Sequence, residues 1–404
     1  SFKWGIPVDF DDKHVIYVWL DALTNYITGI GYDCEGNSSE QYKKLWPADL
    51  HLIGKDIIRF HTIYWPIFLM ALGEPLPKQV FGHPWLLMNN DKMSKSKGNV
   101  IYADDLVDFF GVDAVRYYVL HEMPFDNDGN ITWELVTERT NAELANTLGN
   151  LVNRTISMSN KYFGGIVADK KVTGEMDEDL KAVVTGTYKR VSAKMDELRV
   201  ADAITEIFAL FKRCNKYIDE TEPWVLAKDE ANMDRLSTVL YNLVESIATG
   251  ASLLEPFMPS TAKKIVQQLN TSVRSFEDCE KFGLYESGNK VTAEPEILFA
   301  RLKVEEVMEK VNAMYAERKA QAAGENGEAV EENVIDIEPK EEITFDDFAK
   351  MQFQIGEIIK CEEVPKSKKL LCSQVRIGSQ IKQIVSGIKQ HYSAEEMVGK
   401  KVMV

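Results

Sequence analysis

The sequence has few cysteines, and none are paired in a metal-binding or redox pattern. Its five cysteines include no Cys-x-x-Cys pair: Cys34, Cys214, Cys279, Cys361 and Cys372. This odd, scattered set is typical of a reducing compartment and argues against a zinc site built from these residues. The longest nearly continuous apolar run, 63–72, contains Pro66 and is too short to cross a bilayer. No basic segment followed by an apolar stretch opens the chain, so we predict a cytoplasmic protein without a membrane partner.

The sequence also has fewer basic than acidic side chains, 47 against 63, which gives a net charge of −16. The imbalance is uneven: residues 343–404 carry a net +3, which leaves −19 for residues 1–342. Because nucleic-acid binding depends on where positive charge clusters, the acidic average does not exclude it. The 404 residues suffice for two to three domains with their own cores. The chain starts at Ser1 and ends in a strand-like run, so we expect a piece of a longer protein.

The first 116 residues alternate strand-like and helix-like segments. The apolar run 15–20 has the composition of a strand buried on both faces. A second strand is predicted at 49–54, and 79–81 together with 85–88 supply a third. Between them, 56–72 is long enough for a helix, which Pro66 would kink. Strand, helix and strand at this spacing predict a parallel α/β unit.

The pattern changes twice further along the chain. From about 117 to 255 apolar residues recur with a helical period, which predicts a helical bundle followed by one more helix near 304–315. Residues 317–342 hold nine acidic and three basic side chains and no aromatics, a composition typical of a linker. After it the apolar residues alternate as in short strands, with a turn at Gly378, which predicts a small β-barrel that is incomplete at 62 residues.

One loop carries the strongest chemical signal. Residues 92–99 read Lys-Met-Ser-Lys-Ser-Lys-Gly-Asn, with three lysines in six residues. Lysine offers a compact charge that can follow negative charge on a phosphoryl group, serine can donate to phosphate oxygens, and Gly98 permits backbone rearrangement. On composition alone, a solvated basic loop is the commoner explanation.

The string itself resembles the second signature of the class I aminoacyl-tRNA synthetases. Two further stretches, 17–26 and 51–66, are similar to the methionine-pocket segments of the methionyl-tRNA synthetase family. The resemblance implies the second half of a Rossmann-type catalytic domain, a helical-bundle anticodon-binding domain and a partial OB-fold barrel. It assigns 1–116 to the catalytic half, 117–316 to the helical domain with its following helix, 317–342 to the linker and 343–404 to the barrel.

The resemblance also implies which residues hold the substrates. The expected reaction is ATP-dependent activation of methionine and its transfer to tRNA(Met), with Lys95 stabilising the transition state, Lys92 in support, and Mg²⁺ bridging ATP oxygens. The polarizable thioether of methionine makes its most favourable contacts with aromatic rings. The methionine-binding set is Trp19, Ala22, Leu23, Tyr26, Phe60, His61 and Trp65. The ATP-binding set is Gly54, Asp56, His83, Leu86, Lys92 and Lys95.

Further residues are implied to face RNA. Asn150 and Arg154 lie four apart, so one helical face would present both to anticodon bases, and Trp224 after Pro223 would stack on a splayed base. In the C-terminal module, Lys366, Lys368 and Lys369 would contact phosphates. Relatives pair their subunits through this module, which makes a homodimer possible.

Two class I features are missing from the sequence. It has no His-x-Gly-His signature and no paired zinc ligands, so the resemblance places these and the family's zinc in a segment before Ser1. The chain alone is therefore expected to be incomplete for catalysis. Two alternatives stay open: a non-catalytic tRNA-binding protein, and a synthetase for isoleucine, valine, leucine or cysteine, which the segments 17–26 and 60–65 disfavour.

Overall fold

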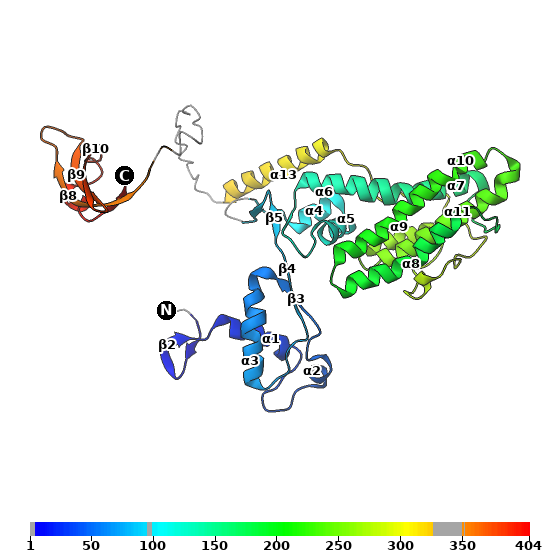
Figure 1. Ribbon diagram of the computed structural model, residues 1–404, viewed down its shortest axis with the longest axis horizontal. Coiled ribbons are helices and arrows are strands. Elements are labelled where there is room, and N and C mark those ends of the chain that lie inside the picture. Colours follow the sequence, from blue (N-terminus) through cyan, green and yellow to red (C-terminus); the bar gives the residue numbers. More distant parts are fainter. Residues whose placement is uncertain (1–4, 95–98, 326–349, 351) are drawn as a thin grey trace. The chain divides into compact units, whose positions relative to one another are not determined.

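The computed structural model describes residues 5–94, 99–325, 350 and 352–404. The chain divides into two compact units, 1–325 and 326–404 (Figure 1). The first unit contains an α/β part and a helical part. None of the helices in the described ranges is long and apolar enough to span a membrane.

The α/β part contains the predicted parallel unit. Strands β3 (His51–Gly54) and β4 (Val80–His83) pair in parallel, and Gly54 lies opposite His83 at their carboxyl ends. The connection between them consists of a 3₁₀ turn (Lys55–Ile57), a π-helical turn (Phe60–Tyr64) and α3 (Trp65–Leu72). The other elements are β1 (Pro7–Val8), β2 (Asp11–Val15), α1 (Val18–Thr28) and α2 (Glu40–Leu45). Six buried side chains form the core: Leu23, Ile27, Tyr42, Trp46, Trp65 and Leu69.

The prediction of a buried strand at 15–20 is wrong. Strand β2 ends at Val15 and helix α1 begins at Val18, whose side chain is 67% exposed. A helix forms here instead of a strand because Leu23 and Ile27, one helical turn apart, are then both buried in the core. A short apolar run does not by itself distinguish a strand from the start of a helix.

The predicted third strand is in fact two strands in two sheets. Pro84, which lacks a backbone N–H, separates β4 from β5 (Leu86–Met88). Strand β5 pairs with β6 (Asp91–Lys92) and β7 (Gly129–Asn130). The connection from β5 to β6 is Asn89-Asn90, with φ values of 52° and 62°, as in a type I′ hairpin turn. This hairpin leads directly into the signature loop.

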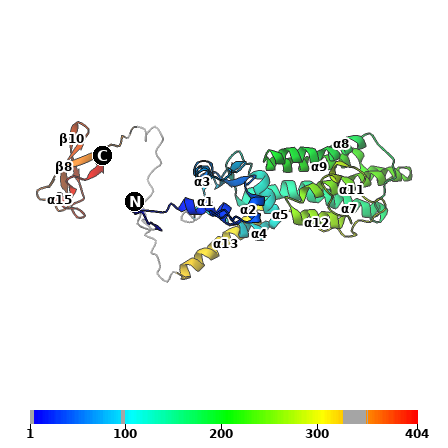
Figure 2. The same cartoon turned by 90° about the horizontal axis from the view of Figure 1, so that it is seen from below.

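The helical part confirms the predicted bundle (Figures 1 and 2). Two short helices, α4 (Ala103–Phe110) and α5 (Val112–Tyr117), and a π-helical turn (Tyr118–Glu122) lead into it. A continuous helical segment follows, made of α6 (Trp133–Arg139), a π-helical stretch (Thr140–Gly149) and α7 (Asn150–Phe163). The remaining bundle helices are α8 (Asp177–Asp196), α9 (Val200–Thr221), α10 (Pro223–Leu226), α11 (Met233–Leu254) and α12 (Pro259–Gln268).

Helix α13 (Val304–Glu325) runs nine residues into the segment predicted as a linker. Composition was misleading there because α13 keeps an apolar face. Val307 and Val311 are buried in one cluster with Trp133, and Arg318 binds both carboxylate oxygens of Asp105. Residues 326–349, which include the rest of the predicted linker, lie outside the described residues.

The second unit is an antiparallel sheet of four strands in the order β10-β9-β8-β11. The strands are β8 (Ile355–Glu363), β9 (Leu371–Ile377), β10 (Gln380–Ser386) and β11 (Lys401–Met403), with the short helix α15 (Ala394–Met397). The predicted alternation is confirmed, since Leu371, Ser373 and Val375 are buried. The hairpin turns at Gly378, whose φ of 58° suits glycine.

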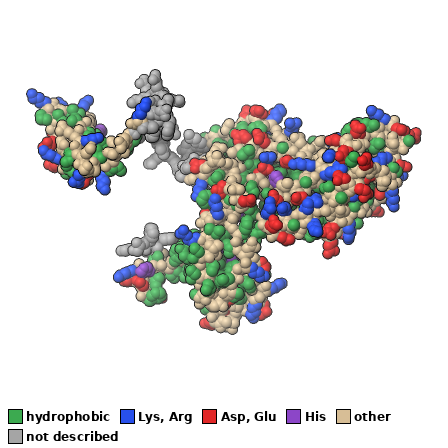
Figure 3. All heavy atoms as spheres, viewed as in Figure 1, with side chains coloured by type: hydrophobic (Ala, Val, Ile, Leu, Met, Phe, Trp, Pro, Cys, Tyr) green, Lys and Arg blue, Asp and Glu red, His purple; other side chains and the backbone are tan. Residues whose placement is uncertain are grey.

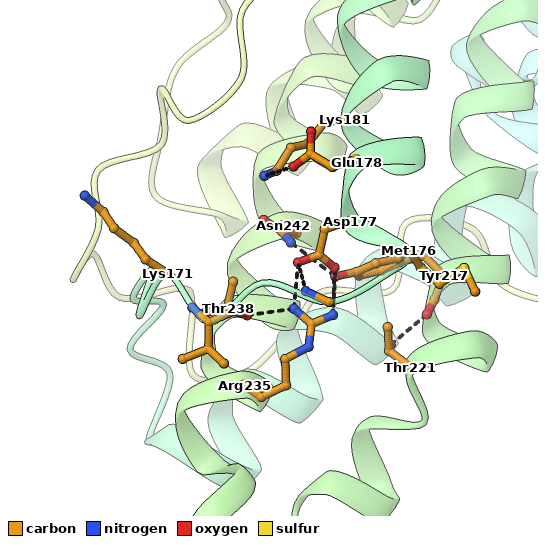
Figure 4. Close-up of polar contacts among 12 residues, drawn as sticks. Lys171, Met176, Asp177, Glu178, Lys181, Tyr217, Thr221, Arg235, Thr238 and Asn242 are labelled. Atoms are coloured by element: carbon orange, nitrogen blue, oxygen red, sulfur yellow. Dashed lines mark hydrogen bonds and ion pairs between the residues drawn. The ribbon is translucent and has the colours of Figure 1, made fainter.

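Two buried ion pairs stabilise the bundle, one between its helices and one between α11 and the segment after α12. Asp177, 1% exposed, binds the Arg235 guanidinium through two contacts of 2.6 Å and accepts from the Tyr217 hydroxyl at 2.7 Å (Figure 4). Burial alone would raise the pKa of Asp177, but the hydrogen bonds from Arg235 and Tyr217 bring it below its usual value. This network links α8, α9 and α11.

The second pair is centred on Glu245, which is fully buried in α11. Its two carboxylate oxygens accept from the Arg274 guanidinium at 2.9 and 2.5 Å. They also accept from the backbone N–H groups of Gly283, Leu284 and Tyr285 at 2.8, 3.0 and 2.7 Å. One buried carboxylate therefore fixes the segment that returns along the bundle.

We expect Glu245→Gln to lower the free energy of unfolding by about 3 kcal/mol or more, because the buried Arg274 charge loses its partner. Urea unfolding followed by circular dichroism measures the change. The control Glu296→Gln removes an exposed carboxylate that pairs with Lys264, and should cost less than about 1 kcal/mol. Equal losses in the two variants would contradict the assignment of Glu245 as an anchor.

Candidate functional sites

An aromatic cluster forms where α1 meets the π-helical turn. The rings of Trp19 and Phe60 stack with centroids 3.9 Å apart and planes 8° apart. The Tyr26 hydroxyl lies 2.8 Å from Nε2 of His61, and Nδ1 of His61 lies 3.0 Å from the Ile57 carbonyl oxygen. Because a carbonyl can only accept, Nδ1 of His61 carries a proton and donates it to Ile57. The structure thus brings four of the predicted methionine-binding residues together.

Of the other three members of that set, Trp65 lies next to the cluster, with its ring centroid 6.1 Å from that of Tyr26. Leu23 and Trp65 are 1% and 0% exposed and belong to the core behind the cluster, whereas Ala22 is exposed. Trp65 donates its indole N–H to Nε2 of His51 at 3.2 Å. His51 was missed by the sequence analysis, although its ring lies 4.4 Å from that of Tyr26. Its place at the start of a strand, on the same face as the buried Ile53, was the available signal.

Three of the predicted ATP-binding residues, Gly54, Asp56 and His83, meet at the carboxyl ends of β3 and β4. A Cβ added to Gly54 would lie 2.5 Å from Oδ1 of Asp56 and 3.9 Å from Cε1 of His83. Only glycine therefore lets the Asp56 carboxylate lie against the end of the strand. In open α/β sheets, ligands bind outside the carboxyl ends of the strands, which is where these three residues gather.

A cavity of about 260 Å³ lies beside this edge. Two predicted ATP-binding residues, His83 and Leu86, line it. The remaining lining residues are Pro84, Trp85, Val119, Met123, Phe125 and Gly129. Its walls are mainly apolar and aromatic, as suits a planar ring.

Only part of the signature loop is described. Lys92 ends β6, and its Nζ lies 3.3 Å from the centroid of the Trp85 ring. Lys95 lies outside the described residues. Asn99 ties the two ends of the loop together: its Oδ1 accepts from the Ser94 N–H at 2.8 Å and its Nδ2 donates to the Lys92 carbonyl at 3.1 Å. The sequence analysis gave no role to Asn99, whose contacts lie within the loop, and it missed Trp85, whose contact with Lys92 joins β6 to the segment before β5.

A second cavity, also of about 260 Å³, lies between α7 and α10. Arg154 and Trp224 line it, so two predicted anticodon residues 70 positions apart meet. The sequence analysis missed the other lining residues, which follow one face of α7: Asn153, Ser157, Met158, Lys161 and Tyr162. Pro223 is buried at the start of α10, and Asn150 is exposed one turn before Arg154 but does not line the cavity.

The predicted phosphate-contacting lysines lie in the second unit. Lys366, Lys368 and Lys369 are exposed in the turn between β8 and β9. Ser367 holds the turn, because its hydroxyl accepts from the N–H groups of Lys369 and Leu370 at 3.3 and 3.1 Å.

Three family models match the chain. Residues 1–156 match class I tRNA synthetases (M), residues 167–320 match the anticodon binding domain of methionyl tRNA ligase, and residues 353–404 match a putative tRNA binding domain. The chain belongs to the methionyl-tRNA synthetase family. Within that family it is 50% identical over 404 residues to the methionine–tRNA ligase of Clostridium perfringens and 45% identical over 408 residues to that of Bacillus subtilis.

The whole chain is covered in both comparisons, but it spans only 61% and 60% of these relatives. A solved structure of the family is also similar: Mycobacterium tuberculosis methionyl-tRNA synthetase in complex with methionyl-adenylate. It is 41% identical with a TM-score of 0.68, over 74% of this chain and 59% of the other. The fold predicted from the resemblance is thereby confirmed, with a partial Rossmann-type catalytic part.

The α/β part of this family member exposes many large apolar side chains on the face seen in Figure 3. Ile6, Phe10, Ile67 and Met70 are between 53% and 94% exposed. Exposed apolar patches are typical of surfaces that bind a protein, a membrane or a ligand.

The buried His51 should make stability depend on pH. Burial, and secondarily the charge of His61, lowers the pKa of His51, so the unfolded chain takes up this proton at a higher pH than the folded chain. Its contribution is full above the ordinary histidine pKa of about 6.5 and is lost as pH falls toward the folded pKa, by at most about 1.4 kcal/mol per pH unit.

We expect His51→Gln to reduce this loss of stability between pH 7 and pH 5. The free energy of unfolding, measured in urea at several pH values, gives the two slopes. The exposed His14 provides the control, since His14→Gln should keep the wild-type slope. A His51→Gln variant with the wild-type slope would show that His51 does not titrate as described.

Proposed function

We propose that this chain supplies the signature-loop half of the active site and the tRNA-binding parts of a methionine–tRNA ligase. The observation that carries the proposal is the meeting, within one α/β part, of the stacked aromatic cluster and the Gly54, Asp56 and His83 edge. The 41% identical Mycobacterium tuberculosis enzyme was solved in complex with methionyl-adenylate, and a site for this molecule needs both a thioether pocket and a nucleotide pocket.

The proposed reaction has two steps. A methionine carboxylate oxygen attacks the α-phosphorus of ATP, and the bond to pyrophosphate breaks to give methionyl-adenylate. The terminal tRNA hydroxyl then attacks the methionyl carbonyl carbon and AMP leaves. The protein acts mainly by positioning and by stabilising charge.

Each group of residues has a distinct part in this proposal. Trp19 and Phe60 offer ring faces to the thioether, while His61 holds the Tyr26 hydroxyl in place. The Asp56 carboxylate can accept both ribose hydroxyls, and the cavity beside His83 and Leu86 suits the adenine. Lys92 and Lys95 provide the positive charge for the phosphates.

Mg²⁺ is proposed as the counter-ion of ATP. No three His, Cys, Asp or Glu side chains cluster as a metal site in the described ranges, so these residues offer no dedicated cage. Mg²⁺ is commonly held through substrate phosphates and neutralises their charge there. Zinc, which the resemblance placed outside this chain, stays a prediction.

The proposed roles of the domains are those predicted from the sequence. We propose 1–116 as the catalytic half, 117–316 for the tRNA(Met) anticodon and 343–404 for tRNA phosphates, in a cytoplasmic enzyme of translation. The cavity lined by Arg154 and Trp224 supports the anticodon role, and Asn150 lies one helical turn before Arg154 on α7. A homodimer through the second unit stays a prediction. The alternative of a non-catalytic tRNA-binding protein finds no support in the comparisons.

Replacing Lys95 tests the catalytic proposal. We expect Lys95→Ala to lower methionine-dependent exchange of pyrophosphate into ATP by roughly 10²- to 10³-fold, because the transition state loses a positioned charge. The assay uses the full-length gene product. Lys78→Ala, which removes an exposed lysine paired with Asp49, should keep wild-type exchange. Undiminished exchange in Lys95→Ala would refute the role of Lys95, and wild-type exchange with another amino acid alone would refute the methionine assignment.

Replacing Trp224 tests the anticodon proposal separately. We expect Trp224→Ala to lower kcat/KM for tRNA(Met) charging by about 5- to 150-fold, through loss of base stacking of roughly 1–3 kcal/mol. The matched control is Phe276→Ala, since Phe276 is another exposed aromatic side chain of the helical part, 51% exposed against 40% for Trp224. Equal effects of the two substitutions would argue against a specific base at Trp224.

A further inference from the structure

The Trp85 indole holds two ammonium groups at once. Nζ of Lys92 lies 3.3 Å and Nζ of Lys55 lies 4.3 Å from its ring centroid. Both distances lie within the roughly 6 Å range in which a cation is attracted to an aromatic face. Lys55 follows β3, Trp85 precedes β5 and Lys92 ends β6, so three segments around the candidate ATP site meet at one ring.

The backbone of Trp85 is held by two hydrogen bonds. Oδ1 of Asp128 accepts from the Trp85 N–H at 2.9 Å, and the Gly129 N–H donates to the Trp85 carbonyl at 3.1 Å. Asp128 also pairs with the Lys55 ammonium. The hydrogen bonds from Lys55 and Trp85, together with the charges of Lys55 and Lys92, lower the pKa of Asp128, so it is ionised at neutral pH.

The two lysines have different partners. Asp128 forms an ion pair with Lys55, whereas no carboxylate among the described residues lies within ion-pair distance of Lys92, whose charge acts on Asp128 from farther away. A carboxylate bound to Lys92 would have to be displaced before the lysine could reach a phosphate. An aromatic face orders the same side chain but leaves its full charge available, which reduces the entropy lost when the phosphate binds.

We propose that Trp85 is a positioning residue for Lys92, on which the ammonium rests until the phosphates of ATP replace the ring as its partner. Lys55 and Asp128 hold the ring in place and are not themselves exchanged. This inference rests on the proposed function, because it assigns Trp85 a part in the ATP site of that reaction.

The contact can be tested without any activity. The emission of Trp85, taken as the difference between the spectra of the wild type and Trp85→Phe, should change on Lys92→Met. It should not change on Lys78→Met, which removes an exposed lysine of the same α/β part. Adding pyrophosphate with Mg²⁺ should produce a change like that of Lys92→Met. A Trp85 spectrum that Lys92→Met leaves unaltered overturns the proposal whatever the enzyme's activity.

The functional part is tested by a double-mutant cycle in the full-length gene product. Trp85→Leu keeps an apolar side chain without the aromatic face and should lower kcat/KM for ATP in pyrophosphate exchange by about 5- to 30-fold. The KM for methionine should stay unchanged, and Trp85→Phe should restore most of the loss. In the Lys92→Met background, Trp85→Leu should add less than about twofold, because the residues act as one unit.

The outcomes distinguish the positioning role of Trp85 from the proposed function of the chain. The positioning role would be overturned if the losses in kcat/KM for ATP multiplied in the double variant, or if Trp85→Leu raised the KM for methionine as much as it lowered kcat/KM for ATP. Trp85 would then only shape the cavity. Wild-type protein without methionine-dependent exchange would instead refute the proposed function, and the spectra would then decide the Lys92 contact alone.

Discussion

Glu245 lies in the middle of α11, a helix whose residues from Leu236 to Leu254 are all buried. A charge at such a position is tolerated only when it is fully compensated, and here the Arg274 guanidinium and three backbone N–H groups do so. The three N–H groups belong to the segment that leaves the bundle. That segment then runs along the earlier helices: Val167 exchanges backbone hydrogen bonds with Gly288 and Asn289, and the Asn160 side chain donates to the Thr292 carbonyl.

The same segment delivers α13 to the α/β part. The Asn141 side chain binds the backbone of Leu302 in both directions, at 2.8 Å, immediately before α13 begins. Val307 and Val311 then pack in the same cluster as Met88, which precedes the hairpin turn, and Met93, which lies in the signature loop. A buried carboxylate in the bundle thus fixes the segment that leads to α13, and α13 packs in one cluster with Met93 of the signature loop.

The sequence predicted those parts of the fold that depend on local periodicity. The parallel pair of β3 and β4, the bundle helices and the alternation in β9 all follow from apolar spacing. The errors at 15–20, at 84 and in α13 share another cause, because each was decided by contacts between distant segments: the Leu23 and Ile27 packing, the assignment of β5 to a different sheet, and the Arg318 contact with Asp105.

The sites show the same division. The family resemblance singled out Gly54, Asp56 and Arg154, and the structure places Gly54 against Asp56 and Arg154 in a cavity with Trp224. The resemblance could not separate Trp19 from Trp65, although one stacks in the cluster and the other is fully buried in the core. The sequence also gave no indication of the roles of Asn99 and Trp85, because their contacts with Lys92 and Ser94 depend on how the hairpin folds.

The burial of α11 on every side also has a consequence for the motions of the molecule. A helix with one solvent face can release its amide hydrogens through local fraying, but α11 is enclosed by α7, α8, α9 and α12. Its central amides can exchange with solvent only when the bundle as a whole opens. Their exchange rates therefore report the global free energy of unfolding. In a single hydrogen-exchange experiment they provide an internal reference for the local opening of the β5–β6 hairpin and of α13.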